Sequence, residues 1–274
     1  MKSRNRMRHR NLLYWLATSL RMTKWTIKAM ILGNLNYKTN FVLTILNTFV
    51  GILSYAFLGS TIVYQKGIED YGVSSSIAFL LSGYIALYLL GPLEGHLEFS
   101  AEFYNLMSLM PVPLWCIFFS RTLLAFTKTL SFILVILFIA FLFGVSFNVN
   151  IFLLMYTLLF SVLLGIGVGL LSSGVNFIVK KGNPIRWIID ILESLLSGRW
   201  FPITILPTFL RYFSWILPST PLNYCLRTSL FAGASPINFL HFIIFASTSL
   251  SYFLLGYIVF WRGVQKIRRE GLIL

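Results

Sequence analysis

The chain has 274 residues, of which 57% are hydrophobic and only 11% are charged. Soluble domains carry about 25% charged residues, so this composition excludes an ordinary water-soluble domain and predicts an all-α polytopic membrane protein. The net charge of +14 does not indicate a nucleic-acid partner, because the basic residues gather at the chain ends and in one short loop. Cys116 and Cys225 lie far apart in apolar segments, which predicts buried thiols rather than a disulfide framework.

The first 40 residues contain nine basic residues and no acidic one. From about Asn11, an apolar arc lies beside an arc that carries Arg21, Lys24 and Lys28, which predicts an interfacial amphipathic helix in the cytoplasmic headgroup layer. A basic arm for nucleic acid is the alternative. This basic segment is too long for the n-region of a signal peptide, so we expect an internal span to direct insertion.

Two membrane spans are predicted next. Residues 41–64 form the first, since about 24 helical residues are enough to cross the ~30 Å core of a bilayer. The second runs from about Ser74 and stops at the Gly91–Pro92 step. A short polar loop joins the two spans.

Residues 93–110 are predicted to form an amphipathic helix of a different kind. One face carries polar side chains at helical spacing, namely Glu94, Glu98, Glu102 and Asn105. A separate apolar stripe consists of Phe99, Phe103, Leu106 and Met110. By itself, this pattern predicts a solvated acidic face on a helix at the cytoplasmic interface.

The apolar run from Pro111 to Phe147 is longer than one span requires. Arg121 and Lys128 interrupt its first half, and either cation at the membrane centre would cost about 2.5–3.5 kcal/mol. The predicted third span is therefore 129–147, with both cations near the cytoplasmic headgroups.

Small residues mark the fourth predicted span, Ile151–Val179. Gly165 and Gly169 have the GxxxG spacing, which favours close helix packing. A flexible gating helix is the alternative interpretation of these glycines.

The fifth predicted span begins near Trp187 and contains two acidic residues, Asp190 and Glu193, on one face. Ionised groups at this depth face a partner or a cavity. We expect an ion pair with Arg186 or a position at the wet interface, and a proton relay is the alternative.

The segment Ser197–Arg227 reads SGRWFPITILPTFLRYFSWILPSTPLNYCLR and interrupts the membrane pattern. Its four prolines exclude a simple span, because a spanning helix must satisfy its own backbone hydrogen bonds. Its seven aromatic residues predict a position at headgroup level, either as an outer interfacial loop or as a re-entrant segment. A sixth span is predicted at 237–260, followed by a basic tail at 261–274.

Charge asymmetry predicts the orientation of these six spans. One side collects nine basic residues from 1–40, three from 180–186 and four from the tail, whereas the other side has four. Positive loops stay in the cytoplasm, so both termini are expected there and the proline-rich segment outside.

Motifs for chemistry are missing from the sequence. There is no GxxxxGK[ST] loop for ATP, no GxSxG and no HExxH, and the three histidines lie far apart. We therefore expect neither an enzyme nor a chain that holds its own metal or cofactor.

The pattern as a whole resembles the type-2 permease family of ATP-binding-cassette (ABC) transporters. The family's Ser-Gly, aromatic-Pro, Leu-Pro, Leu-Pro and closing Arg steps are matched by Ser197, Gly198, Phe201, Pro202, Leu206, Pro207, Leu217, Pro218 and Arg227. The 93–110 helix, ending in MPVP, is similar to the family's cytoplasmic coupling helix, although the family's Gly-Thr-Leu-Glu is replaced by Glu102-Phe103-Tyr104-Asn105. The basic N-terminal helix is similar to the family's connecting helix.

This resemblance implies a single permease domain over 1–274, with its six-span core at 41–260, in the cell membrane. It implies an exporter that works by alternating access with a second permease chain, identical or different, and with separate subunits that bind ATP and Mg. The acidic face of Glu94, Glu98, Glu102 and Asn105 would dock on the ATP-binding subunit. Short re-entrant helices would include Phe201, Pro202, Pro207, Pro218 and Arg227.

Two other classes of function stay open from the sequence. An ion-coupled secondary transporter would use Asp190 and Glu193. A membrane scaffold or sensor that transports nothing would explain the helices, but not the acidic helix or the proline-rich segment.

Overall fold

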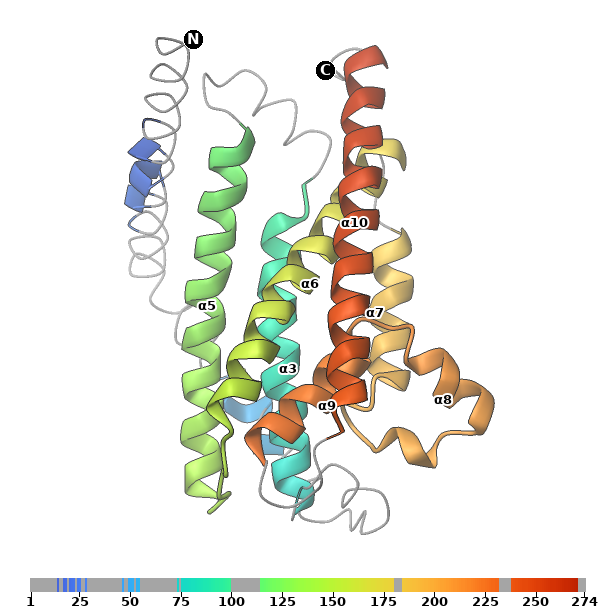
Figure 1. Ribbon diagram of the computed structural model, residues 1–274. Coiled ribbons are helices and arrows are strands. Elements are labelled where there is room, and N and C mark those ends of the chain that lie inside the picture. Colours follow the sequence, from blue (N-terminus) through green and yellow to red (C-terminus); the bar gives the residue numbers. More distant parts are fainter. Residues whose placement is uncertain are drawn as a thin grey trace.

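The computed structural model describes residues 75–99, 114–179, 184–231 and 238–270, together with Val73 and scattered helical positions between 14 and 54. Within this part of the chain nearly every residue is helical and there is no β-strand, although Asn148 and Phe231 form an isolated β-bridge. The long helices stand side by side as one bundle (Figure 1). The predicted span at 41–64 and most of the N-terminal helix lie outside the described residues.

In the part of the chain that the structure describes, four helices are long and apolar enough to cross a membrane, which confirms an all-α, multi-pass architecture. They are α3 (Ser76–Leu97), α5 (Leu114–Leu142), α6 (Ile151–Val179) and α10 (Phe239–Glu270). The bounds of α6 coincide with the predicted fourth span. In Figure 1, α3, α6 and α10 run in one direction and α5 runs in the other.

Glycines bring α6 and α10 into direct backbone contact. A Cβ added at Gly167 would lie 2.6 Å from the backbone nitrogen of Phe253, and one at Gly174 would lie 2.6 Å from that of Phe260. Lipid tails are as apolar as leucine, so helices in a membrane gain stability from such close van der Waals packing rather than from burial. Among the described helices, α6 and α10 are the most extensively packed pair.

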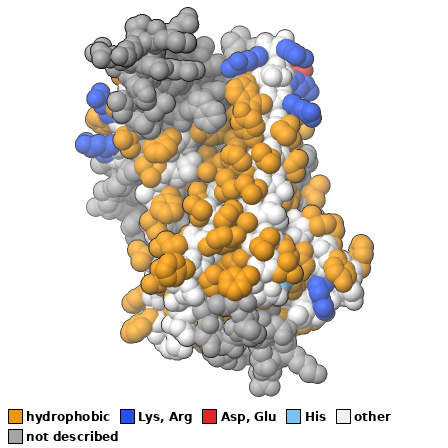
Figure 2. Space-filling view, in the orientation of Figure 1, with side chains coloured by type: hydrophobic (Ala, Val, Ile, Leu, Met, Phe, Trp, Pro, Cys, Tyr) orange, Lys and Arg blue, Asp and Glu red, His pale blue; other side chains and the backbone are white. Residues whose placement is uncertain are grey.

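The surface of the bundle is apolar over its middle. In Figure 2, hydrophobic side chains cover much of the middle of the described surface, and most of the visible Lys and Arg side chains lie in the upper part of the view, several of them where α10 stops. Large exposed hydrophobic side chains lie on α5, α6 and α10, among them Phe141, Phe152 and Leu254. Water would penalise such a surface, whereas hydrocarbon would not.

The helix α3 corrects the prediction that the second span stops at Gly91–Pro92. It passes through Pro92 and ends at Leu97, after which Glu98 is extended with φ −75° and ψ 112°. Proline removes one hydrogen-bond donor, but membrane helices tolerate this loss where neighbouring helices hold the chain. A separate helix beginning at residue 93 is therefore wrong, and residues 100–113 lie outside the described part.

The helix α5 is one continuous rod that includes Arg121 and Lys128, whereas the predicted third span began only at residue 129. It ends at Leu142 rather than at Phe147, and the turn that follows contains Gly144 at φ +66°. This left-handed conformation suits glycine and terminates helices. Similarly, α10 continues ten residues beyond the predicted end at Phe260, so much of the expected tail is helical.

The helix α7 (Pro184–Leu196) has 13 residues, or about 20 Å, which is shorter than a bilayer core. A fifth full span is therefore not shown. After α7 the chain forms the 3-10 helix η2 (Ile203–Ile205), α8 (Thr208–Ser214) and α9 (Ser219–Leu230) before α10 begins. Figure 1 shows this segment leaving and rejoining the bundle near the same end.

Candidate functional site

Arg227 fastens the start of the proline-rich segment to α3. Its side chain, on α9, is fully buried at 0% exposure, and its guanidinium lies 3.5 Å from the centre of the Phe79 ring. It donates hydrogen bonds to the carbonyl oxygens of Gly198 (2.8 Å), Arg199 (3.2 Å) and Phe79 (3.2 Å) and to the Ser82 hydroxyl (3.1 Å). Three donor nitrogens of one rigid fork thus join α9, α3 and the segment after α7.

Glycines make this junction sterically feasible. A Cβ added at Gly83 of α3 would lie 2.6 Å from the Arg199 carbonyl oxygen and 3.0 Å from Nη2 of Arg227. Gly198 adopts φ +70°, a conformation that side chains disfavour, and a Cβ there would lie 2.7 Å from Ile203. The Ser-Gly step of the sequence is thus the turn that lets α7 end and the chain fold against α3.

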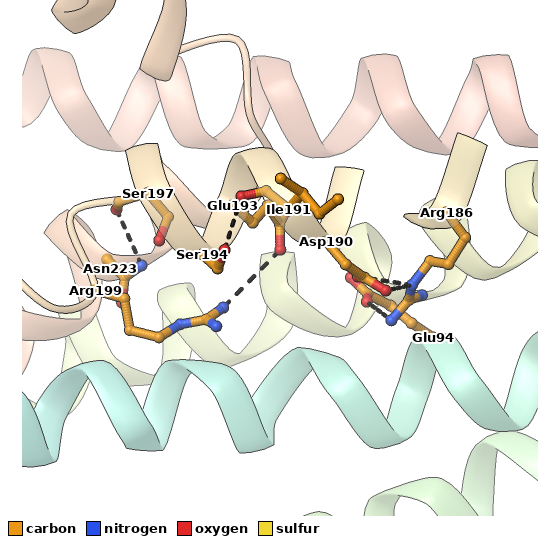
Figure 3. A network of polar contacts seen from close by, with 9 residues as sticks. All are labelled: Glu94, Arg186, Asp190, Ile191, Glu193, Ser194, Ser197, Arg199 and Asn223. Atoms are coloured by element: carbon orange, nitrogen blue, oxygen red, sulfur yellow. Dashed lines mark hydrogen bonds and ion pairs between the residues drawn. The ribbon is translucent and has the colours of Figure 1, made fainter. Parts of the chain in front are cut away.

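A chain of charged side chains joins α3 to α7 (Figure 3). Nη2 of Arg186 lies 2.8 Å from the carboxylate of Glu94, which is only 4% exposed. Nε of the same arginine donates to Asp190 at 2.9 Å, one helical turn along α7. The expected ion pair between Arg186 and Asp190 is confirmed, and it includes a buried glutamate from another helix.

A second buried pair lies further along α7 (Figure 3). Glu193 is 6% exposed, and its carboxylate lies 3.9 Å from Nη2 of Arg199, which is 8% exposed. This separation is an ion pair but exceeds a hydrogen bond. Asn223 of α9 donates to the Ser197 carbonyl oxygen at 3.2 Å and holds the end of α7 against α9.

Several buried polar atoms in and beside this network have no hydrogen-bond partner among the described residues. They are Glu94 Oε1, Glu193 Oε1, Ser197 Oγ, Arg199 Nε, Ser219 Oγ, Thr220 Oγ1 and Asn223 Oδ1. Burying such atoms without partners costs free energy, so this part of the molecule carries an unusual concentration of polar groups for an apolar bundle. Among the described residues, no group of three or more His, Cys, Asp or Glu could hold a metal ion.

The two described residues of the predicted docking face, Glu94 and Glu98, do not share one exposed face. Glu94 is buried in α3, so its predicted position on a solvated acidic face is wrong. Glu98 lies half-buried just after α3 and accepts a hydrogen bond from the Asn176 amide at 3.0 Å. Glu102 and Asn105 lie outside the described residues. The helix α3 ends at Leu97 and the chain is extended at Glu98, so Glu94 and Glu98 do not lie on one face of a continuous helix.

Three of the four prolines of the segment directly precede a helix, and the fourth, Pro221, lies in the first turn of α9. Pro202, Pro207 and Pro218 stand directly before η2, α8 and α9. Proline suits a helix start, since the first helical N–H groups have no partner within the helix. Phe201 is half-buried beside Trp200, whose ring packs edge-on against Tyr84 of α3 at 5.4 Å.

Gly165 and Gly169 lie where α6 meets α3. A Cβ at these positions would come within 2.8 Å of Leu93 and 2.7 Å of Leu97. The contact of α6 with α10 escaped the sequence reasoning, although Gly167 and Gly174 share their seven-residue spacing with Gly256 and Gly263. Gly83 was also missed, because a single glycine in an apolar run carries no distinctive signal.

Comparison of the sequence with protein-family models and with curated proteins found no match. The four long apolar helices establish a membrane-embedded, multi-pass protein. An assignment of family or function therefore rests on the sequence and structure of this chain alone.

Proposed function

We propose that the chain is the membrane-spanning permease subunit of an ATP-driven transporter of the ABC type, and that it exports its substrate. The observation that carries this proposal is the segment Ser197–Phe231, which folds back between α7 and α10 and is fastened to α3 by Arg227. A proline-rich segment at this place is also the basis of the sequence resemblance to type-2 permeases.

In the proposed mechanism, α3 connects the two ends of the molecule. Phe79 and Ser82 near its start contact Arg227, while Glu98 after its end contacts Asn176 of α6. A separate ATP-binding subunit would dock at the cytoplasmic end, on Glu98, Glu102 and Asn105, and its closure on ATP and Mg would move α3 and α6 together. The bundle would pair with a second permease chain to enclose the pathway, with both termini in the cytoplasm.

ATP hydrolysis by the affinity-isolated protein tests this proposal. The chain has no P-loop, so vanadate-sensitive hydrolysis that follows the tagged chain must come from a partner. We expect Glu102→Lys, alone and with Glu98→Lys, to lower this activity at least tenfold, because like charges would face the partner's docking surface. Glu270→Lys, a matched reversal at the exposed end of α10, should leave it unchanged.

If both variants that carry Glu102→Lys hydrolyse ATP at the wild-type rate, this region does not dock the ATP-binding subunit. Glu102→Lys is tested alone because Glu98 also accepts a hydrogen bond from Asn176. A reversal of Glu98 would weaken this contact within the fold as well as any docking contact.

One observation favours a second candidate, an ion-coupled transporter. Glu193 is buried beside Arg199, and its Oε1 has no hydrogen-bond partner among the described residues, as expected of a carboxylate that takes up an ion. Asp190 fits this role poorly, because it is exposed and paired with Arg186. Transport that persists without an ATP-binding subunit and stops on Glu193→Gln would favour this candidate.

A further inference from the structure

The exposed face of α10 is apolar over one bilayer thickness. Its large exposed hydrophobic side chains begin at Phe239 and end at Ile258, and they include Ile243, Leu250 and Leu254. The rise from Phe239 to Ile258 is about 29 Å, which matches the ~30 Å thickness of a bilayer core. This face of α10 therefore lies against lipid tails, with Ile258 near one edge of the core.

The same face becomes basic directly beyond this edge. Arg262 and Arg269 are both exposed, and at helical spacing they continue the line of Leu254 and Ile258. The last nine residues of α10 contain four basic residues and one acidic residue. Several of the basic side chains visible in Figure 2 lie where α10 stops. One continuous helix face thus passes from hydrocarbon to positive charge.

Arg262 lies at the depth of the lipid headgroups. It is about 6 Å beyond Ile258, and the headgroup layer adds roughly 5–8 Å to each side of the core. Side chains on a helix point back toward its N-terminus, so the long side chain of Arg269 is directed at the same layer. Tyr257 and Trp261 pack edge-on at this level with ring centres 6.3 Å apart, as is typical of aromatic residues at a membrane interface.

Lys266, between the two arginines, faces the protein instead. Its Nζ donates to the Ile178 carbonyl oxygen of α6 at 3.1 Å and lies 3.9 Å from the carboxylate of Glu270. The cations at this end of α10 therefore have different surroundings. Lys266 fastens α10 to α6, whereas Arg262 and Arg269 lie on the face that meets lipid.

We propose that Arg262 and Arg269 bind the headgroup of an anionic phospholipid in the leaflet at this end of the bundle, and that the lipid holds the α6–α10 pair at this depth. Arginine binds phosphate oxygens through its fork of N–H groups, and a second basic residue nearby adds attraction to an anionic surface. The acyl chains of the lipid would lie along Leu250, Leu254 and Ile258. This binding does not depend on the proposed function of the chain.

Thermal unfolding of the full chain in neutral detergent with added lipid tests the proposal. We expect phosphatidylglycerol to raise the Tm by about 3 °C or more, and phosphatidylcholine and inorganic phosphate to raise it by less than about 1 °C, because a ligand stabilises the state that binds it. Arg262→Gln with Arg269→Gln should remove about half of the phosphatidylglycerol shift or more, whereas Arg262→Lys with Arg269→Lys should keep most of it. Lys266→Gln is the matched control, one turn from Arg262, and should leave the shift unchanged.

Hydrogen exchange locates the effect on the chain. In nanodiscs with equal amounts of phosphatidylcholine and phosphatidylglycerol, the amides of 259–270 should exchange about threefold more slowly than in phosphatidylcholine alone, and the double glutamine variant should lose this difference. Both arginines are exposed, so this variant should unfold at the wild-type Tm without lipid. An equal Tm shift with phosphatidylcholine, or a full phosphatidylglycerol shift in the glutamine variant, would overturn the proposal. A full shift with inorganic phosphate would overturn the lipid in favour of a free anion.

Discussion

Arg227 is the side chain on which the position of the proline-rich segment depends. It donates hydrogen bonds to the carbonyl oxygens of Gly198 and Arg199 in the turn that follows α7. Without Arg227 these oxygens would be buried without a donor. A lysine would keep the charge but could not reach four acceptors from one planar group.

Arg227→Lys should therefore destabilise the protein by at least about 3 kcal/mol, since hydrogen bonds from charged groups contribute about 1.5–3 kcal/mol each. Thermal unfolding in detergent measures the effect. Arg211→Lys is the control, because Arg211 is half-exposed and its Nη2 bonds to the Thr204 carbonyl oxygen. A similar loss of stability in Arg227→Lys and Arg211→Lys would contradict the role of Arg227 in holding the proline-rich segment.

Two glycines of α3 offer a matched test of the same junction. Gly83→Ala should lower stability, because the added Cβ would meet the Arg199 carbonyl oxygen at 2.6 Å. Gly91→Ala should be neutral or stabilising by up to about 1 kcal/mol, because alanine is the better helix former and a Cβ at Gly91 meets no described atom within 4 Å. Equal Tm values for these two variants would contradict the close approach of the segment to α3.

At the scale of the elements, the pair of Glu94 and Arg186 joins α3 to α7. Removing one partner leaves a buried charge alone, which costs about 3–5 kcal/mol, whereas removing both costs much less. We expect Arg186→Gln to be the most harmful variant and Glu94→Gln with Arg186→Gln to recover part of the loss. A double-mutant cycle on urea or thermal unfolding measures the coupling, and additive single effects would argue against the contact.

The contact between α6 and α10 should also behave as one unit. Gly167→Ala and Gly256→Ala both place a methyl group between the same two backbones. Once the first substitution has separated the helices, the second should add little, so the double variant should be less destabilised than the sum. Gly95→Ala, whose Cβ would meet no described atom within 4 Å, provides the control.

The sequence predicted the bounds of some helices more accurately than those of others. The bounds of α6 follow from its flanks, where asparagines precede a run of apolar and small residues and lysines close it. The end of α3 was misplaced because the rule for proline is local, while packing against other helices overrides it. The cations of α5 set only where its membrane-spanning part was predicted to begin, and the helix itself continues through Arg121 and Lys128.

For the whole molecule, the buried charges mark the limit of prediction from one sequence. The spacing of Arg186 and Asp190 predicts their pairing within one helix. Glu94 lies more than ninety positions from Arg186, so no periodicity connects them, and its spacing with Glu98 suggested an exposed face instead. Composition was enough to predict a membrane protein. The contacts between helices could not be predicted, because they depend on which helix faces pack together in the fold.

The most direct test of the permease proposal is to isolate the tagged chain from its native membrane in gentle detergent and identify what accompanies it by mass spectrometry. We expect an ATP-binding subunit in stoichiometric amount, which is lost on Glu102→Lys and kept on Glu270→Lys. Recovery of the chain without any ATP-binding subunit, under conditions that preserve other membrane complexes, would contradict the proposal and turn attention to Glu193 as the site of ion coupling.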